Sequence, residues 1–297
     1  MCSSRNPIHC IISPRILDAM LASKDAKVRK SALETIKLSS FIRGRRSVLR
    51  NVHTSLFTAQ SSGLKRSIFD SAEQETDPPT GSLVRKEGGA ATDDEAVNEA
   101  YDGLGATYKF YQDVFERDSI DDHGMALNAY VHFAQGFNNA FWDGAEMVFG
   151  DGDGIVFVRF TKSLDVIGHE LTHGVTEHTA ALEYHTQAGA LNESMSDVFG
   201  SLIKQYHLGQ SAADADWLIG AELLAPGVSG KALRSMADPG SAFDDPRLGG
   251  KDPQPKTMDD YLDLPDTRSG DWGGVHENSG IPNHAFYLVA TALGGNA

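Results

Sequence analysis

Cysteine is scarce in this sequence, and its position excludes a fold built on disulfides. Cys2 and Cys10 are the only cysteines among 297 residues, so a disulfide framework cannot hold the body of the chain together. Long apolar runs are also absent, since no stretch approaches the roughly 20 residues that a membrane-spanning helix needs. With 40% hydrophobic and 23% charged residues, the composition is that of a globular protein with one large or two ordinary domains.

A secretory signal is not evident at the N-terminus. The apolar stretch from Ile8 to Ile12 is shorter than the hydrophobic region of a signal peptide, and Pro14 and Arg15 interrupt its continuation. We therefore expect either a cytoplasmic protein or one that leaves the cell by a route without a cleaved signal peptide.

Positive charge is in deficit overall but concentrated at one end. The net charge of −15 argues against nucleic acid or an anionic membrane as the main partner. Residues 1–69 contain 13 Lys and Arg against 3 Asp and Glu, whereas residues 70–297 contain 13 against 38. The basic leader either binds the acidic body by electrostatic attraction or is a solvated tail, and charge alone leaves both open.

The hydrophobic pattern changes along the chain in three stages. Residues 15–40 have helical spacing, and the basic stretch from Arg43 to Arg50 is typical of an exposed linker that proteases cut. From His123 to Phe160 the pattern favours strands, with a hairpin expected where two apolar runs flank the turn-rich residues 149–154. Helices are predicted over 93–117, 164–179, 189–207 and 277–293.

The segment His169-Glu170-Leu171-Thr172-His173 predicts a metal site. Histidines at positions i and i+4 lie about 40° apart around a helix, so both imidazoles can bind one Zn²⁺. Glu170 then lies beside the metal, where it can accept a proton from water. A helix with two incidental histidines is the alternative, because so short a pattern also occurs by chance.

A catalytic zinc needs a third protein ligand, and the sequence offers two candidates. His178 lies about 180° around the same helix from His169, which favours a surface position. Glu193 stands in a second predicted helix that follows a break at Gly189, and its apolar neighbours favour a buried carboxylate with a partner. Asp197 is four residues further on, where it can hydrogen-bond the free nitrogen of a ligating histidine.

These motifs resemble the thermolysin family of zinc metalloendopeptidases, the gluzincins. The resemblance extends from about residue 83 to the end of the chain. It is carried by HELTH (169–173), NESMSD (192–197), NNAFWDGAEMVFGDGDG (138–154), GVTEHTAALEY (174–184), LRSMADP (233–239) and GGVHENSGIPNHAFY (273–287).

The resemblance implies an α+β fold with two lobes and a zinc cleft between them. We expect a pro-segment over residues 1–50, a strand-rich lobe over 51–163 and a helical lobe over 164–297, which looks truncated against the family. It also implies an endopeptidase that cuts proteins and peptides before bulky apolar residues, with Glu170 as general base. We expect a monomer, secreted without a cleaved signal, with the cytoplasm as the alternative location.

Further roles follow from the resemblance position by position. Tyr184 and His276 resemble the family's donors to the oxyanion, and Asp271 resembles the carboxylate that orients the histidine. Asn139 and Ala140 resemble the edge-strand residues that bind the substrate backbone. Arg234 resembles the arginine that contacts the substrate carbonyl beyond the scissile bond.

The double calcium site of many relatives is not expected here. Asp165 and Asp216 match two of its ligands, but Lys204 stands where the family often has glutamate. Leu218 and Ala221 occupy two further acidic positions. We predict that the ammonium of Lys204 pairs with Asp165 or Asp216 in place of Ca²⁺.

The short leader resembles that of the protealysin subgroup, through residues 13–17 (SPRIL). It is expected to inhibit the enzyme before cleavage, and Cys10 can be a thiolate ligand that occupies the open zinc position. Two other functions compete with an active endopeptidase. One is a catalytically inactive zinc-binding homologue that serves as an interaction module, which the retained Glu170, Tyr184 and His276 disfavour. The other is an aminopeptidase, for which no anchor for a substrate N-terminus is evident.

Overall fold

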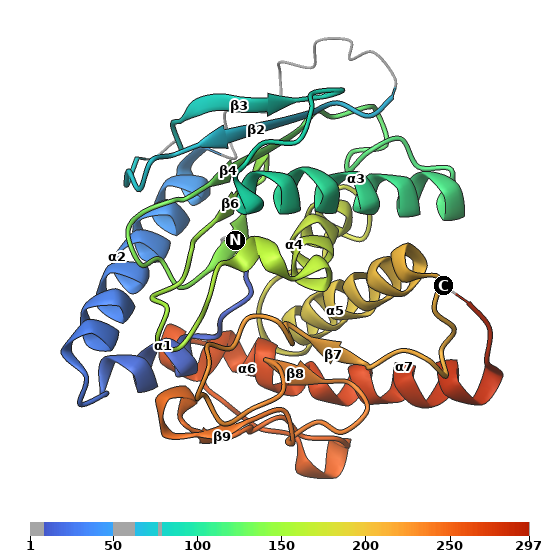
Figure 1. The fold of residues 1–297 in the computed structure, drawn as a ribbon. Coiled ribbons are helices and arrows are strands. Elements are labelled where there is room, and N and C mark those ends of the chain that lie inside the picture. The colour runs from blue at the N-terminus through green and yellow to red at the C-terminus, as the bar shows by residue number, and fades with distance from the viewer. Residues whose placement is uncertain (1–8, 50–62, 77–78, 297) are drawn as a thin grey trace.

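A computed structural model of the chain describes residues 9–49, 63–76 and 79–296. A lobe containing a mixed sheet lies above a mostly helical lobe, and helix α4 passes between them (Figure 1). The strands are β1 (His9–Cys10), β2 (Arg66–Asp70), β3 (Ser82–Lys86), β4 (Leu127–Val131), β5 (Ala140–Trp142), β6 (Glu146–Phe149), β7 (Leu218–Ile219), β8 (Arg234–Ser235), β9 (Asp244–Asp245) and β10 (Gly250–Lys251). The α-helices are α1 (Pro14–Leu21), α2 (Ala26–Leu49), α3 (Glu95–Phe115), α4 (Leu164–Glu177), α5 (Thr186–Leu208), α6 (Asp271–Asn278) and α7 (Gly280–Leu293).

The main sheet has six strands in the order β1-β5-β6-β4-β2-β3. Strands β2, β4 and β6 are parallel to one another, whereas β5 is antiparallel to β6. The edge strand β1 comes from the leader and pairs antiparallel with β5, with His9 opposite Trp142 and Cys10 opposite Phe141. The leader thus completes the sheet at the edge that faces the helical lobe's α4, which packs against β5.

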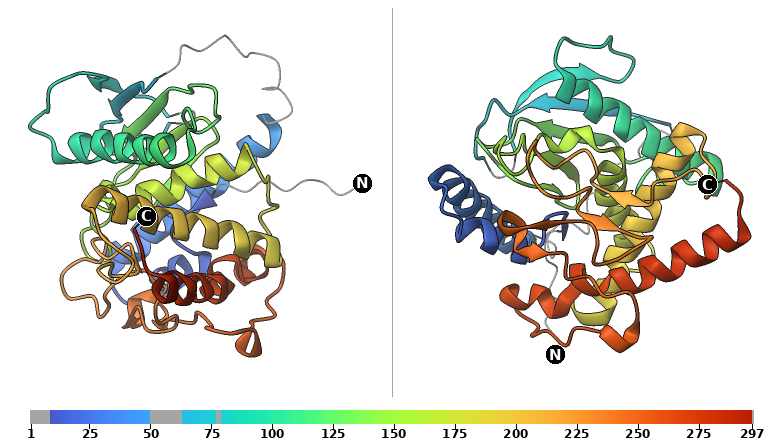
Figure 2. Two further views of the ribbon diagram at one scale, coloured as in Figure 1. Left: turned by 90° about the vertical axis from the view of Figure 1, so that its right-hand side faces the viewer. Right: turned by 60° about the horizontal axis from the view of Figure 1, so that its bottom comes forward.

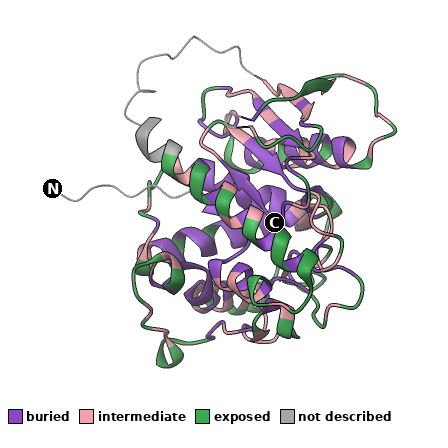
Figure 3. Cartoon of the chain, turned by 90° about the vertical axis from the view of Figure 1, so that its left-hand side faces the viewer, coloured by how far each residue is buried: buried purple, intermediate pink, exposed green. Residues whose placement is uncertain are grey.

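The sheet and the helices beneath it share one buried core. Trp142, Phe149 and Phe157 from the sheet lobe are fully buried and belong to the same cluster as Ile167 and Leu171 of α4. Figure 3 shows this as buried strands in the interior of the sheet lobe, with exposed residues along the outer face of α2. Burial of α4 on both sides explains why its histidines lie inside the protein.

The predicted hairpin around residues 149–154 is wrong, because residues 154–160 do not form a strand. The Oδ1 atom of Asp153 accepts hydrogen bonds from the backbone N–H groups of residues 155–157 at 2.9, 2.7 and 3.3 Å, which curls the chain away from an extended path. The hairpin lies earlier, between β5 and β6. There Asp143 Oδ1 accepts from the N–H groups of Ala145 and Glu146.

The leader is packed against both lobes and is not a solvated tail over its described residues. Thr35 of α2 accepts a hydrogen bond from the N–H of Asn138 at 3.0 Å, and Asp18 of α1 pairs with Arg268 at 2.9 Å. Figure 2 shows the two leader helices together along one side of the molecule. The linker predicted at Arg43–Arg50 is also wrong, since α2 continues to Leu49; Arg50 lies outside the described residues.

The second ligand-bearing helix begins earlier than predicted. Helix α5 starts at Thr186, so Gly189 lies within it and does not break it. A Cβ at Gly189 would come within 2.4 Å of Val275 Cγ1, so glycine allows α5 and α6 to approach closely here. The predicted helices over 93–117, 164–179 and 277–293 are confirmed as α3, α4 and α7 within a few residues. Across the described residues, no helix combines the length and apolarity that crossing a membrane requires.

Candidate metal centre

The two histidines of α4 point their Nε2 atoms at one another inside the protein. Both side chains are fully buried, and the Nε2 atoms lie 3.0 Å apart. Asp197 Oδ1 lies 2.8 Å from the Nδ1 of His169, and Asn192 Oδ1 lies 2.8 Å from the Nδ1 of His173. Because each Nδ1–H donates to its acceptor, both Nε2 atoms present lone pairs to the same point.

Glu193 of α5 completes the cluster. Its Oε2 lies 3.5 Å from the Nε2 of His169, and its Oε1 lies 3.3 Å from the Nε2 of His173. The ligand atoms of the three residues all lie within 4.8 Å of one another. The Oε2 atom has no hydrogen-bond partner although it is buried.

This convergence fits a divalent cation. Two nitrogen lone pairs and a carboxylate in a dry interior repel one another unless a positive charge lies between them. Burial lowers the pKa of His169 to about 4, so this imidazole is neutral, as a metal ligand must be. Two imidazoles and one carboxylate form one of the ligand sets of catalytic zinc sites, which leave a position for water.

Asp197 connects the cluster to Arg234. Burial favours its neutral form, but the guanidinium of Arg234 outweighs that and holds the pKa of Asp197 at about 2. Arg234 donates to both carboxylate oxygens, from Nε at 2.8 Å and Nη2 at 2.7 Å. One carboxylate therefore orients a metal-binding imidazole and fixes an arginine at the same time.

Glu170 lies beside the cluster with one oxygen uncommitted. Its Oε2 accepts the N–H of Trp142 at 3.2 Å, whereas its Oε1 has no hydrogen-bond partner. Burial, together with the charge of Glu193, raises the pKa of Glu170 well above its ordinary value. A carboxyl group with a raised pKa and a free oxygen is suited to exchange protons with a water molecule near neutral pH.

Tyr184 and His276 approach the cluster from the loop before α5 and from α6. The Tyr184 hydroxyl donates to Glu193 Oε1 and lies 3.3 Å from the Nε2 of His276. Asp271 holds this imidazole through its Nδ1 and its backbone N–H, both at 2.6 Å. Burial alone would lower the pKa of His276, but the charges of Asp271 and Glu193 raise it to about 10, so the imidazole is protonated and donates from Nε2.

The leader occupies the cleft beside these donors. The Nε2 of His276 donates to the carbonyl of Cys10 at 2.9 Å, and Arg234 Nη1 donates to the carbonyl of Ile11 at 3.3 Å. In the other direction, the N–H of Ile11 donates to Ala140 O at 3.4 Å, and the N–H of Ile12 donates to Asn139 Oδ1 at 3.2 Å. The structure thus brings together all the residues that the sequence assigned to the site except the thiol of Cys10 and the alternative ligand His178, which is exposed.

The leader residue that touches the metal-binding histidines is His9, which the sequence analysis missed. Its ring stacks on His173 with centroids 4.2 Å apart and lies edge-on to Tyr184 at 4.5 Å. Since neighbours in a strand point to opposite faces, the thiol of Cys10 lies on the other side, in an apolar cluster with Phe141. Burial raises the pKa of Cys10 to about 12, which disfavours the thiolate. The expectation that Cys10 joins the ligand cluster is therefore corrected to His9 as the neighbouring residue.

The predicted ion pairing of Lys204 is confirmed. Lys204 Nζ lies 3.1 Å from Asp165 Oδ2 and 2.9 Å from Asp216 Oδ2. Asp165 is fully buried, whereas the side chain of Asp216 is 47% exposed. The ammonium stands between both carboxylates, as the sequence predicted.

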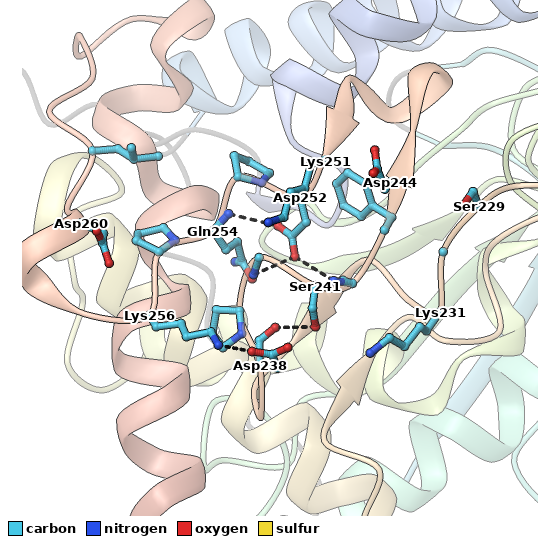
Figure 4. A pocket seen from close by; sticks show the side chains of 18 residues that line it. Ser229, Lys231, Asp238, Ser241, Asp244, Lys251, Asp252, Gln254, Lys256 and Asp260 are labelled. Atoms are coloured by element: carbon cyan, nitrogen blue, oxygen red, sulfur yellow. Dashed lines mark hydrogen bonds and ion pairs between the residues drawn. The ribbon is translucent and has the colours of Figure 1, made fainter.

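A separate pocket in the helical lobe lies away from the metal-binding cluster. It has a volume of about 960 Å³, and Figure 4 shows its polar lining. Lys256 pairs with Asp238, and Asp252 accepts hydrogen bonds from the N–H groups of Gly240 and Ala242, each at 3.1 Å. None of the three clustered ligands lines it, so size alone does not identify the functional site.

Comparisons with known proteins agree with this geometry. The description "Thermolysin metallopeptidase, catalytic domain" matches residues 44–177, and "Thermolysin metallopeptidase, alpha-helical domain" matches residues 180–297. An extracellular metalloprotease of Pectobacterium carotovorum subsp. carotovorum is 51% identical over 291 residues, which are 98% of this chain and 81% of the relative. Protease PrtS of Photorhabdus sp. (strain Az29) is 57% identical over 80% of this chain and 62% of its own length.

A solved structure has the same fold over nearly the whole chain. The precursor of protealysin, a metalloproteinase from Serratia proteamaculans, superposes with a TM-score of 0.85 at 49% identity. The match covers 97% of this chain and 82% of the solved one. The leader described above therefore has a counterpart in a known precursor.

Proposed function

This chain belongs to the thermolysin family of metallopeptidases, and we propose that the side chains around His169, His173 and Glu193 cleave internal peptide bonds of proteins. The chain is a zinc-dependent metalloendopeptidase made as a precursor. The observation that carries the assignment of roles is the convergence of two buried imidazole nitrogens and a carboxylate beside Glu170.

The proposed roles follow from donors, acceptors and charges. Zn²⁺ would be held by His169, His173 and Glu193, where it would act as a Lewis acid toward the scissile carbonyl and lower the pKa of water. Glu170 accepts the proton of the attacking water on its uncommitted Oε1 and passes it to the leaving amine. Tyr184 and protonated His276 donate hydrogen bonds to the carbonyl oxygen as it gains negative charge.

Substrate binding is proposed to use strand addition at β5. The leader residues already hydrogen-bond to Ala140 O, Asn139 Oδ1 and Arg234 in the way an extended substrate would. The residue whose N–H bonds Ala140 is Ile11, which supports a preference for a bulky apolar residue after the scissile bond. Because the leader fills these positions, it is proposed to inhibit the precursor.

The location is proposed from the names of relatives. Relatives from three bacteria carry names of proteases, two of them "extracellular". We propose that this enzyme also acts outside the cell, reaching it without a cleaved signal peptide, and that it acts as a monomer. An inactive zinc-binding module is disfavoured, because such a module has no use for the Glu170, Tyr184 and His276 arrangement.

The test compares wild type with Glu170→Gln on casein after the same brief trypsin treatment of each precursor, with trypsin inhibited before the assay. Bound zinc should be equal, while activity should fall by roughly 10²–10⁴-fold because the general base is lost. Glu183→Gln makes the same chemical change at a 65% exposed side chain and should retain wild-type activity. Equal activity in wild type and Glu170→Gln would contradict the proposal.

A further inference from the structure

The peptide bond between Cys10 and Ile11 is held in the cleft as a substrate bond. We propose that the precursor hydrolyses this bond itself, as a first cut that loosens the leader. This inference rests on the proposed function and adds to it a named self-cleavage site.

The carbonyl side of the bond faces the groups that stabilise negative charge. Cys10 O accepts a hydrogen bond from His276 Nε2 at 2.9 Å, and the Tyr184 hydroxyl lies 3.3 Å from the same nitrogen. His9, the residue before the bond, stacks on the metal-binding ring of His173. The carbonyl carbon that is brought to the metal cluster is therefore that of Cys10.

The amine side of the bond is fixed by the edge strand and by an arginine. Ile11 donates its N–H to Ala140 O and accepts from Arg234 at its own carbonyl. Arg234 is in turn held by two hydrogen bonds to buried Asp197. The nitrogen that leaves when this bond breaks is therefore that of Ile11.

The register is specified, because a shift by one residue reverses the direction of every side chain and backbone group. Such a slip would turn the buried side chains of Ile11 and Ile12, each 1% exposed, toward other surroundings and would remove the acceptor from His276. Neither neighbouring peptide bond can then occupy the same place without loss of these contacts.

The proposed reaction is a hydrolysis. The oxygen of water adds to the carbonyl carbon of Cys10, and the bond from this carbon to the nitrogen of Ile11 breaks. One proton of the water passes through Glu170 to that nitrogen. The products are a fragment of residues 1–10 that ends in a carboxylate and a chain that begins with the free amine of Ile11.

Release of the fragment can also be followed through the reactivity of the Cys10 thiol, which does not depend on activity toward added substrate. Among the described residues, the fragment is anchored by the two-residue strand β1, the stacked ring of His9, and the carbonyl and buried side chain of Cys10. Once the fragment leaves, the thiol of Cys10, now 3% exposed, becomes accessible to a thiol reagent. Before the cut this thiol should react slowly.

The experiment uses the full chain with Cys2→Ser, so that Cys10 is the only thiol. Zinc-loaded precursor is followed by intact mass, N-terminal sequencing and labelling with a thiol reagent. We expect a fragment ending at Cys10, a new N-terminus at Ile11, and thiol labelling that rises at the same rate. Glu170→Gln should bind zinc but show neither the fragment nor an increase in labelling.

Two variants of Ile11 test whether the cut depends on the register of the leader in the cleft or only on a loosely bound leader. Ile11→Val keeps the apolar side chain and the N–H and should be cut at the same bond. Ile11→Pro lacks the N–H that Ala140 accepts and should show at least a 100-fold slower cut there. A first cut at a neighbouring bond, or equal cutting in Ile11→Pro, would overturn the inference.

Failure of this inference can be told apart from failure of the proposed function. If trypsin-treated protein digests casein while the bond between Cys10 and Ile11 stays intact in the untreated precursor, the self-cleavage site is wrong and the endopeptidase remains. If zinc binds but neither casein nor this bond is cut, both proposals are wrong.

Discussion

Replacing Lys204 with alanine should lower the free energy of unfolding by about 3–5 kcal/mol, the range found when one partner of a buried ion pair is removed. The estimate comes from the pair with Asp165, which is fully buried and has no access to water once the ammonium is gone. The pair with Asp216 adds at most about 1 kcal/mol, because that carboxylate is 47% exposed and water screens it.

The loss should depend on pH in a defined direction. Burial already raises the pKa of Asp165, and Lys204 works against this by favouring the charged form. Without Lys204 the pKa of Asp165 rises further. The loss of stability is therefore fully present above that raised pKa and shrinks as the pH falls through it, since protonation removes the uncompensated charge.

The measurement is urea unfolding of the full chain at several pH values, with Glu170→Gln in every sample to prevent self-digestion. Lys162→Ala is the matched control, because Lys162 is exposed and lies two residues before α4. A loss in Lys204→Ala no larger than that of the control, or a loss that grows as the pH falls, would refute the reasoning.

Three further predictions concern His276, the surroundings of Lys204 and the leader. Asp271→Asn should lower the pKa of His276 from about 10, so the protonated donor is lost at lower pH and the alkaline limb of the kcat profile shifts down without loss of bound zinc. When calcium is titrated into the wild-type protein, no pair of tightly bound ions should form near Lys204. Calcium stoichiometry by mass spectrometry measures this. Cys10→Ser should leave the precursor inhibited toward casein, because His9 and the backbone carry the contacts with the cleft; restored activity in the intact precursor would show that the thiol matters.

The sequence predicted the metal site better than the fold around it. The i, i+4 spacing of His169 and His173 determines their common face once a helix forms, and Glu193 stands out as a carboxylate among apolar neighbours. His276 and Arg234 were assigned only through resemblance. Asp271 lies five residues before His276 in α6, but Tyr184 is brought to His276, and Asp197 to Arg234, by tertiary packing. Spacing along the chain does not report that packing.

The errors have local physical causes. Residues 154–160 look like a strand, but three hydrogen bonds to Asp153 bend the backbone there. Residues 43–49 look like a linker by charge, yet they continue a helix whose inner face buries Ile42. His9 and Cys10 are both residue types that bind zinc, but strand alternation allows only one of the two neighbours to face the metal cluster, and the sequence does not show which one.

The pairing of β1 with β5 has a consequence for the life of the molecule after the leader departs. The backbone groups of Ala140 and its neighbours then form an unpaired sheet edge. Such an edge can pair with any extended polypeptide, including a locally unfolded segment of a second copy of the chain. While the leader is bound, residues 9–12 keep that edge paired. The sheet edge that later binds substrates is thereby prevented from pairing between copies of the enzyme and causing aggregation.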